Sequence, residues 1–507
     1  MAHPIMIQGT MSGAGKSLLT AALCRIFKQD GFSVAPFKSQ NMALNSAVTK
    51  EELEIGRAQA MQAEACGIEA SVLMNPVLLK PNGDTRSQVI VKGEVYANMN
   101  AVDYYAFKKN LIPVVKETYQ ELSSLYDIVV IEGAGSPAEI NLKENDFANM
   151  GMADIADAPV LLVGDIDRGG VFAQFVGTVE LLEKEERERI KGFVINKFRG
   201  DKSILDPGIK MLEEKTGIEV FGTLPYLKIN LDDEDSLSLN KKNGDASGKV
   251  NVAVVRLPRI SNFTDFSNLE QRDDVYLHYV SSSQELKDCD FLILPGTKNT
   301  LGDLLWLKNT GLEKGIKDFA KSGRPLLGIC GGYQILGKEL LDSSGEGDCI
   351  SAEGLNLLPV STRIGESKIR KNVSFILEQC GGFFSCLSGM PISGYEIHMG
   401  QTKVLPCESL KDKCHDFTGA SGCQYGNVYG TYVHGFFDEE GVAQKVVQAL
   451  AKEKGIACTK GKNDSWKKTK EKQFDYLAEQ LRQHLDMDKI YHVLGYDIRG
   501  ERPNGNF

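Results

Sequence analysis

The chain has 507 residues, of which 42% are hydrophobic, and a formal net charge of −10 at pH 7. This length exceeds what one hydrophobic core usually organises, so we expect two or three domains. The acidic balance argues against a general nucleic-acid-binding protein, because basic clusters such as the four lysines between 467 and 472 are short.

Neither a membrane span nor an export signal is expected. No window reaches the roughly 18 apolar residues of a spanning helix, and the first segment, MAHPIMIQGT, enters a strand pattern without a charged region and a cleavage site. The 11 cysteines lack CxxC pairs and zinc-like spacing, and their odd number indicates reduced thiols. These features predict a cytoplasmic protein with small-molecule partners.

In the first 230 residues, short apolar runs alternate with helical stretches. The runs are PIMIQG, SVAPFK, DIVVIEGAG, PVLLVGDI and GFVINKF, each bounded by glycine, proline or charged residues. This alternation predicts a parallel sheet covered by helices, in a first domain over residues 1–230. The polar, acidic segment 231–249 is expected to be a linker, and its run at 232–235 is more typical of solvated charge than of a cation site.

A second alternation begins at residue 250 with VNVAVVRLP, DFLILPGT and PLLGIC, and continues to GNVYGTYVHGFF. It predicts another α/β domain with a parallel sheet, over residues 250–445. The remaining residues, 446–507, carry Phe474, Leu477, Leu481 and Leu485 at helical spacing, which predicts a helical C-terminal extension. The expected fold class is therefore two parallel-sheet α/β domains with a helical tail.

The first apolar run leads into the glycine-rich segment GTMSGAGKS, which precedes the helical stretch LLTAALCRIF. This is the context of a phosphate-binding loop. Glycines such as Gly13 and Gly15 let backbone N–H groups face phosphates, and the helix N-terminus adds its positive end. In that arrangement Lys16 would meet the β and γ phosphates of ATP, and Ser17 a magnesium ion.

The spacing of this loop departs from the strict phosphate-loop pattern. Thr10 stands where a glycine is usual, and Gly9 lies one position earlier. This variant resembles the loop of dethiobiotin synthetase-like enzymes. Met11 occupies the place where dimerising partitioning ATPases would carry a second lysine, which argues against a nucleotide switch.

Other polar side chains follow predicted strands, at the edge where parallel sheets bind ligands. Glu132 ends one strand, where its carboxylate would reach the magnesium ion beside Ser17, directly or through water. Asn196 ends another, where its amide would meet the adenine edge, although an ordinary loop position explains it equally well. Candidate substrate or phosphate contacts are Lys38, Gln40, Asp167 and Arg168, with Lys80 and Arg86 as weaker ones.

The segment GICGG at 328–332 follows an apolar run and matches the pattern G-x-C-x-G. A tight strand-to-helix turn of this kind presents its cysteine, here Cys330, as a nucleophile at the carboxyl edge of the sheet. The N–H of Gly331, with a second from Gly296 or Thr297, would form an oxyanion hole.

A cysteine nucleophile needs a base, and two histidines are candidates. His434, in YGTYVHGFF, follows a predicted strand and precedes a glycine, and it is the favoured one. His398, in GYEIHMG, is the rival. Its neighbour Glu396 indicates that this segment faces the substrate or orients another group.

This arrangement resembles the class I, triad-type glutamine amidotransferases, which hydrolyse glutamine through a cysteine thioester and pass ammonia to a synthetase site. Their usual third member, a glutamate two residues after the histidine, is replaced here by Phe436, as in the subgroup that modifies corrinoids. The motifs GTMSGAGKS, PFKSQNMALNS, NPVLLKP, EGAGSPAEINL, ICGGYQILG, GYEIHMG and YVHGFF make nearly the whole chain similar to the cobyric acid synthase family.

The resemblance implies ATP- and glutamine-dependent amidation of the b, d, e and g carboxylates of adenosylcobyrinic acid a,c-diamide, with Mg²⁺ as cofactor. Two alternatives remain within the ligases: the a,c-diamide-forming synthase, and another glutamine-dependent ligase such as CTP synthase. A nucleotide-dependent regulatory ATPase with a binding-only second domain is a third. The sequence leaves the oligomeric state open, a homo-oligomer included.

Overall fold

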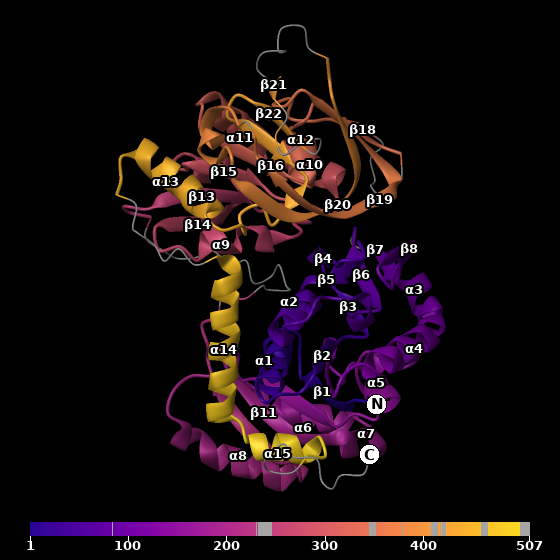
Figure 1. Ribbon diagram of the computed structural model, residues 1–507. Coiled ribbons are helices and arrows are strands. Elements are labelled where there is room, and N and C mark those ends of the chain that lie inside the picture. Colours follow the sequence, from indigo (N-terminus) through magenta and orange to yellow (C-terminus); the bar gives the residue numbers. More distant parts are fainter. Residues whose placement is uncertain are drawn as a thin grey trace.

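The computed structural model describes residues 1–83, 85–229, 231, 246–343, 351–378, 380–406, 414–415, 417, 422–457 and 465–496. Figure 1 shows two α/β domains, one above the other, with the C-terminal helix α14 along the flank of the first. The expected fold class is confirmed. The acidic run at 232–235, and most of the expected linker, lie outside the described residues.

The first domain is built on a six-stranded parallel sheet in the order β12-β11-β10-β1-β9-β2. Its strands are β1 (His3–Gly9), β2 (Val34–Phe37), β9 (Ile128–Glu132), β10 (Val160–Asp165), β11 (Ile190–Phe198) and β12 (Val220–Pro225). The helices are α1 (Lys16–Gln29), α2 (Arg57–Cys66), α4 (Ile112–Ser123), α5 (Met150–Ala156), α6 (Val171–Leu181), α7 (Lys184–Arg189) and α8 (Lys202–Thr216). The predicted apolar runs are these strands, because helices on both faces bury them.

A smaller set of strands in the first domain was not expected from the sequence. A four-stranded sheet has the order β3-β6-β7-β8, and a two-stranded hairpin joins β4 to β5. These strands are β3 (Gln40–Met42), β4 (Ser46–Val48), β5 (Glu54–Gly56), β6 (Val77–Pro81), β7 (Arg86–Val91) and β8 (Glu94–Asn100), followed by α3 (Ala101–Phe107). In Figure 1 they form the end of the first domain that faces the second.

The second domain contains a seven-stranded sheet in the order β14-β13-β15-β16-β23-β22-β21, parallel from β14 to β23. Its strands are β13 (Val250–Val255), β14 (Val275–Val280), β15 (Phe291–Leu294), β16 (Leu326–Ile329), β21 (Cys414–His415), β22 (Gly422–Tyr425) and β23 (Val428–Thr431). The helices are α9 (Ser267–Glu270), α10 (Thr300–Asn309), α11 (Leu312–Lys321), α12 (Gly331–Leu336) and α13 (Val442–Lys454).

A five-stranded sheet, in the order β18-β17-β19-β20-β24, connects the second domain to the first. Its strands are β17 (Glu339–Asp342), β18 (Ser351–Glu353), β19 (Val360–Ile376), β20 (Pro391–Val404) and β24 (Val433–His434). The long antiparallel pair β19 and β20 carries side chains that contact the β4–β5 hairpin and the β7–β8 connection of the first domain.

The C-terminal helices belong to two different cores. Helix α13 runs across the expected boundary at residue 445, and its buried side chains pack in the core of the second domain. We therefore propose that the extension begins after α13. Helices α14 (Trp466–His484) and α15 (Met487–Val493) pack on the first domain, where Phe474, Leu477 and Leu481 join the core beside α1. The predicted amphipathic helix is confirmed.

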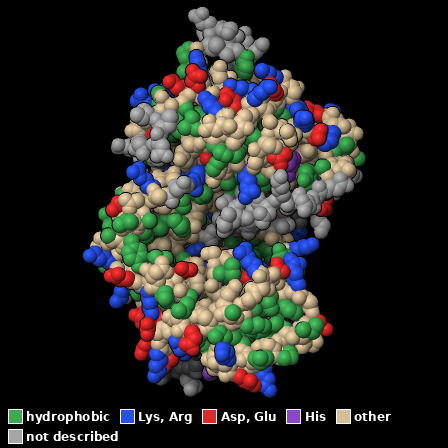
Figure 2. Space-filling view, turned by 180° about the vertical axis from the view of Figure 1, so that it is seen from behind, with side chains coloured by type: hydrophobic (Ala, Val, Ile, Leu, Met, Phe, Trp, Pro, Cys, Tyr) green, Lys and Arg blue, Asp and Glu red, His purple; other side chains and the backbone are tan. Residues whose placement is uncertain are grey.

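The surface carries charges of both signs. On the face seen in Figure 2, Lys and Arg side chains are interspersed with Asp and Glu over both domains. Among the helices of the described residues, none is both long and apolar enough to cross a bilayer.

Candidate active sites

The phosphate-binding loop lies between β1 and α1, as predicted. Gly13 and Gly15 have φ angles of 73° and 100°, which L side chains rarely adopt, so these positions require glycine. Lys16 begins α1, and its Nζ donates to the carbonyl oxygens of Gly135 at 2.9 Å and Met11 at 3.2 Å. The lysine thus folds over the loop, within reach of a phosphate bound there.

Asn196 supports the loop from β11. Its Nδ2 donates to the backbone oxygen of Ala14 at 2.9 Å, and its Oδ1 accepts from the N–H of Lys197 at 2.8 Å. A Cβ on Gly15 would lie 2.2 Å from the same Nδ2. Because its amide already binds the loop backbone, the geometry favours shaping of the loop over contact with adenine.

The Glu132 carboxylate, at the end of β9, accepts hydrogen bonds from three side chains. Its Oε1 accepts from Ser17 Oγ at 2.8 Å and Lys38 Nζ at 3.0 Å, and its Oε2 accepts from Gln62 Nε2 at 2.6 Å. Burial by itself would raise the pKa of Glu132, but the Lys38 charge and the hydrogen bonds outweigh it and lower that pKa. The carboxylate therefore stays ionised beside the Ser17 hydroxyl.

The Ser17 hydroxyl and the Glu132 carboxylate are oxygen ligands that fit Mg²⁺. This ion binds proteins through few carboxylates and completes its coordination shell with water and phosphate oxygens. Within the described parts of the chain, no group of three or more His, Cys, Asp or Glu could hold a metal ion by itself. A magnesium ion at Ser17 and Glu132 would consequently depend on the nucleotide for most of its ligands.

The other predicted contacts of the first domain fall into two groups. Asp167 and Arg168 follow β10, whereas Gln40, Lys80 and Arg86 lie on the β3-β6-β7-β8 sheet. Gln40 Oε1 accepts from the Tyr104 hydroxyl at 2.6 Å, and Asp167 Oδ1 accepts from Arg199 Nε at 2.8 Å. The Arg168 side chain is 64% exposed and lies beside the loop, 3.9 Å from a Cβ placed on Gly13.

Lys80 lines a pocket with residues of the second domain. Arg86 begins β7, in the sheet that faces that domain.

Cys330 occupies a sharp turn between β16 and α12. Its φ and ψ are 50° and −107°, a strained conformation for a residue other than glycine. The turn packs so closely on β15 that a Cβ on Gly332 would lie 2.0 Å from the carbonyl oxygen of Leu294. The backbone N–H of Cys330 donates to the carbonyl oxygen of Thr431 at 2.8 Å, and this hydrogen bond connects the turn to β23. This is the geometry of a nucleophile elbow.

Strand order brings His434 to this cysteine. Strand β23 pairs with β16 in parallel, so both strands end at the same sheet edge, and the chain then enters β24 at Val433. His434 Nδ1 lies 2.8 Å from Asp265 Oδ2, and the N–H of Gly435 donates to Asp265 Oδ1 at 2.9 Å. The sequence had offered no third partner for His434, and the structure supplies Asp265, which is 169 positions away.

The His434–Asp265 pair is almost fully buried, with 1% and 2% of the side chains exposed. Burial by itself would lower the pKa of His434, but the Asp265 carboxylate outweighs it, and contact with Cys330 adds to the effect, so that the pKa rises to about 10. Nε2 is buried, and the interaction of His434 with the Cys330 side chain also favours the protonated ring. A protonated His434 would stabilise a Cys330 thiolate.

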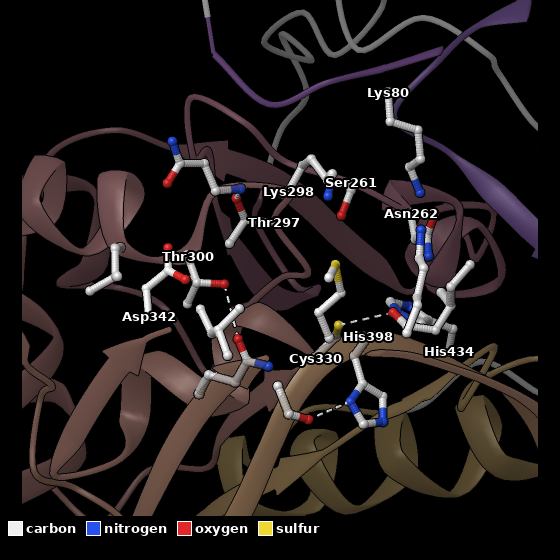
Figure 3. A pocket seen from close by; sticks show the side chains of 18 residues that line it. Lys80, Ser261, Asn262, Thr297, Lys298, Thr300, Cys330, Asp342, His398 and His434 are labelled. Atoms are coloured by element: carbon white, nitrogen blue, oxygen red, sulfur yellow. Dashed lines mark hydrogen bonds between the residues drawn. The ribbon is translucent and has the colours of Figure 1, made fainter. Parts of the chain in front are cut away.

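His398 lines the same pocket but is held differently (Figure 3). Its Nδ1 lies 2.7 Å from the carbonyl oxygen of Gly400, and its ring stacks on Tyr432 with 3.6 Å between centroids. Its Nε2 lies 3.5 Å from Glu396 Oε2, which also binds Lys371 at 3.1 Å. These contacts favour His434 over His398 as the base.

The predicted oxyanion-hole residues lie together beside Cys330. A Cβ on Gly331 would lie 2.9 Å from the backbone nitrogen of Thr297, and a Cβ on Gly296 would lie 3.2 Å from His434 Cε1. The loop is anchored by Asp303, whose Oδ2 accepts from Thr297 Oγ1 at 2.5 Å. The Gly296–Thr297 loop thus packs against the elbow at Gly331.

The cysteine pocket lies at the junction of the two domains. Cys330, His434, His398 and Asp342 of the second domain line it, and Lys80 enters from the first domain (Figure 3). The pocket is therefore completed by both domains.

A buried ion cluster fastens this junction. The Glu54 carboxylate accepts from Lys80 Nζ at 2.8 Å and from Lys368 Nζ of the second domain at 2.5 Å. Burial by itself would raise the pKa of Glu54, but the two lysines hold it well below its usual range. Burial lowers the pKa of Lys368 to about 7.

Comparisons with known proteins define first the class of the two domains. The family model described as CobQ/CobB/MinD/ParA nucleotide binding domain matches residues 5–237, and the CobB/CobQ-like glutamine amidotransferase domain matches residues 251–442. The chain thus joins a nucleotide-binding domain to a glutamine amidotransferase domain.

Similarity over the full length identifies the family. The chain is 52% identical to the cobyric acid synthase of Lachnoclostridium phytofermentans, over 97% of this chain and 99% of that protein. It is 50% identical to the cobyric acid synthase of Ruminiclostridium cellulolyticum, over 100% of this chain and 99% of that protein. The chain belongs to the cobyric acid synthase family, whose members are glutamine-dependent ligases. The family expected from the motifs is confirmed.

Proposed function

We propose that this chain uses ATP and glutamine to amidate the b, d, e and g carboxylates of adenosylcobyrinic acid a,c-diamide, giving adenosylcobyric acid. The observation that carries the proposal is the presence of two built sites in one chain: Lys16 with Ser17 and Glu132, and Cys330 with His434. The full-length similarity to cobyric acid synthases supports this substrate over that of the a,c-diamide-forming synthase.

At the second site, the Cys330 sulfur attacks the side-chain carbonyl carbon of glutamine. The resulting oxyanion faces the N–H groups of Gly331 and of the Gly296–Thr297 loop, which stabilise it. His434 donates a proton to the departing nitrogen, ammonia leaves, and a thioester remains on Cys330. Water then hydrolyses the thioester to glutamate, while Asp265 keeps the imidazole oriented.

At the first site, a corrinoid carboxylate oxygen attacks the γ-phosphorus of ATP, and ADP leaves as the acyl phosphate forms. This activation is needed because hydroxide is a poor leaving group from a carboxylate. Lys16 stabilises charge on the transferred phosphoryl group. Mg²⁺, held by Ser17 and Glu132, would neutralise phosphate charge. Ammonia then displaces phosphate and leaves an amide.

Several polar residues of the first domain are proposed to contact the ligands of the first site. Lys38 and Gln40 lie on the segment that follows β2, and Asp167 and Arg168 follow β10. Glu396 and His398 are instead proposed to orient groups in the glutamine pocket. We also propose a cytoplasmic location, supported by free thiols at the described cysteines 24, 66, 289, 330, 380, 386 and 423.

The substrate is tested by incubating the purified full chain with ATP, glutamine and a panel of corrinoid acids, and following the mass of each corrinoid. We expect the a,c-diamide to pass through four successive amidations. Amidation of cobyrinic acid at positions a and c alone would instead assign the chain to the a,c-diamide-forming reaction.

The division of labour between the two sites is tested with Cys330→Ala and Lys16→Ala, each supplied with glutamine or with ammonium salt at raised pH. Cys330→Ala should lose glutamine-supported amidation and retain amidation with ammonia. Lys16→Ala should lose both by about 10²-fold or more, because a preorganised charge is removed. A folded Cys330→Ala protein that is inactive with ammonia would contradict separate sites.

A further inference from the structure

Ser46, the first residue of β4, is a first-domain residue whose two peptide groups are bound by the second domain. Its N–H donates to Asn262 Oδ1 at 3.0 Å, and its carbonyl oxygen accepts from the Tyr395 hydroxyl at 2.9 Å. Its own hydroxyl accepts from Lys80 Nζ at 2.9 Å. Ser46 is fully buried, so these partners fix its backbone.

Tyr395 connects this backbone to the base of the cysteine site. It lies on β20 directly opposite His434 of β24, and the two rings stack with 5.3 Å between centroids and 25° between planes. Tyr395 is not among the described residues that line the pocket. It therefore covers one face of the imidazole from outside while its hydroxyl holds Ser46.

Asn262 connects the same backbone to Asp265. It precedes the 3-10 helix η5 (Phe263–Phe266), and its carbonyl oxygen accepts from the N–H of Asp265 at 3.1 Å. Its φ of 52° is in the left-handed region, which asparagine tolerates better than most residues. One residue therefore shapes the turn that carries Asp265 and also binds Ser46.

The chain between the two sites is short. Lys38, which pairs with Glu132 at 3.0 Å in the phosphate-loop site, begins a segment that passes through β3 and ends at Ser46. The first site and the His434–Asp265 pair are thus joined by residues 38–46 together with two side chains of the second domain.

From these contacts we infer that Tyr395 and Asn262 are positioning residues of the glutaminase, which orient His434 and Asp265 against the backbone of Ser46 in the first domain. Glutamine hydrolysis accordingly depends on the seating of residues 38–46, the segment that begins at the ATP site. The inference rests on the proposed glutaminase role of Cys330 and His434.

The direct test is Tyr395→Phe in the full chain, which removes the hydroxyl bond to Ser46 and keeps the ring beside His434. We expect kcat for glutamine hydrolysis to fall by about three- to tenfold, the range for one neutral hydrogen bond. KM for glutamine should change less than about twofold, since Tyr395 does not line the pocket. Ammonia-supported amidation should be unchanged.

A spectroscopic measurement separates positioning from general damage. The proton on His434 Nδ1, shared with Asp265, should give a downfield NMR resonance that disappears in Asp265→Asn. In Tyr395→Phe this resonance should shift or broaden. An unaltered resonance together with an unaltered kcat would overturn the inference.

Arg370→Gln is the matched control at the same interface. Arg370 Nη1 donates to the carbonyl oxygen of Gly93 at 2.7 Å and its Nη2 to Glu94 at 2.6 Å, in contacts that reach neither His434 nor Asp265. We expect it to leave glutamine hydrolysis unchanged. An equal loss in Arg370→Gln and Tyr395→Phe would overturn the inference, because any loosening of the interface would then suffice.

A second variant tests the shared role of Ser46. Asn262→Gly keeps the left-handed backbone and removes the Oδ1 acceptor. Combined with Tyr395→Phe, its effect on kcat should be smaller than the product of the single effects, because both act through one residue. If kcat of the double variant instead falls by the full product of the two single effects, the two residues do not act through Ser46. If wild-type protein hydrolyses no glutamine at all, the proposed function fails rather than this inference alone.

Discussion

Replacing Asp265 with asparagine removes the charge that keeps His434 protonated. In the structure this carboxylate, together with a smaller contribution from Cys330, raises the pKa of the buried imidazole from 6.5 to about 10. The difference corresponds to about 5 kcal/mol between the two protonation states. Without it, the pKa of His434 should fall, because burial by itself lowers the pKa. We expect kcat for glutamine hydrolysis to fall by about 10²- to 10⁴-fold, as when a triad loses its orienting carboxylate.

The assay is glutamate release by Asp265→Asn and wild-type protein from about pH 6 to about pH 11. Wild-type activity should decline as the pH rises through about 10, where His434 loses its proton, whereas the variant should lack this decline. The pKa of His434 is raised on folding, so the pair stabilises the protein fully below about pH 6.5 and loses this contribution as the pH rises through about 10.

The stability difference between wild type and Asp265→Asn should shrink over that interval. Asp274→Asn is the matched control: Asp274 is also a buried aspartate of the second domain, paired with Arg272 at 2.9 Å. It should retain glutamine hydrolysis. Activity of Asp265→Asn within about threefold of wild type would refute the assigned role, because a triad carboxylate contributes far more.

Three further outcomes are expected. His434→Asn should abolish glutamine hydrolysis more completely than His398→Asn, measured by glutamate release; the reverse ranking would exchange their roles. Gly332→Ala should destabilise the fold by several kcal/mol in urea unfolding, because its Cβ would lie 2.0 Å from the carbonyl oxygen of Leu294. Glu54→Gln should lower the free energy of unfolding by about 3–5 kcal/mol, because two buried lysines lose their anion. Because the pKa of Glu54 is lowered on folding, the stability difference between wild type and Glu54→Gln should be largest above about pH 4.5 and should shrink on acidification.

Features that depend on residues close in sequence could be predicted. A parallel strand covered on both faces is a continuous apolar run, so β1, β9, β10 and β11 were expected from the local sequence pattern. The phosphate-binding loop and the Cys330 turn are equally local, because their glycines are set by backbone geometry within a few residues. For the same reason, both motifs appeared in the expected strand-to-helix context.

Features that depend on strand order could not be predicted. Asp265 meets His434 only because residues 169 positions apart are brought to one sheet edge. Lys80 was a weaker candidate for contact with an anionic substrate, and only the β3-β6-β7-β8 sheet shows that it lies in the pocket of Cys330. Helical periodicity likewise identifies a buried face without naming its partner. Helix α13, which spans the expected boundary at 445, packs on the second domain, whereas α14 packs on the first.

The interface between the two domains contains a buried ion cluster in place of apolar side chains. Glu54 is fully buried between Lys80 and Lys368, and buried ion pairs often contribute little net stability because desolvation offsets their attraction. They do penalise misalignment, since a displaced domain would leave a buried charge unpaired. Ser46 lies beside this cluster, bonded to Lys80, and also binds the residues that hold His434 and Asp265. We therefore propose that the ion cluster also fixes the alignment of the two domains in which Ser46 can hold the residues that contact His434 and Asp265.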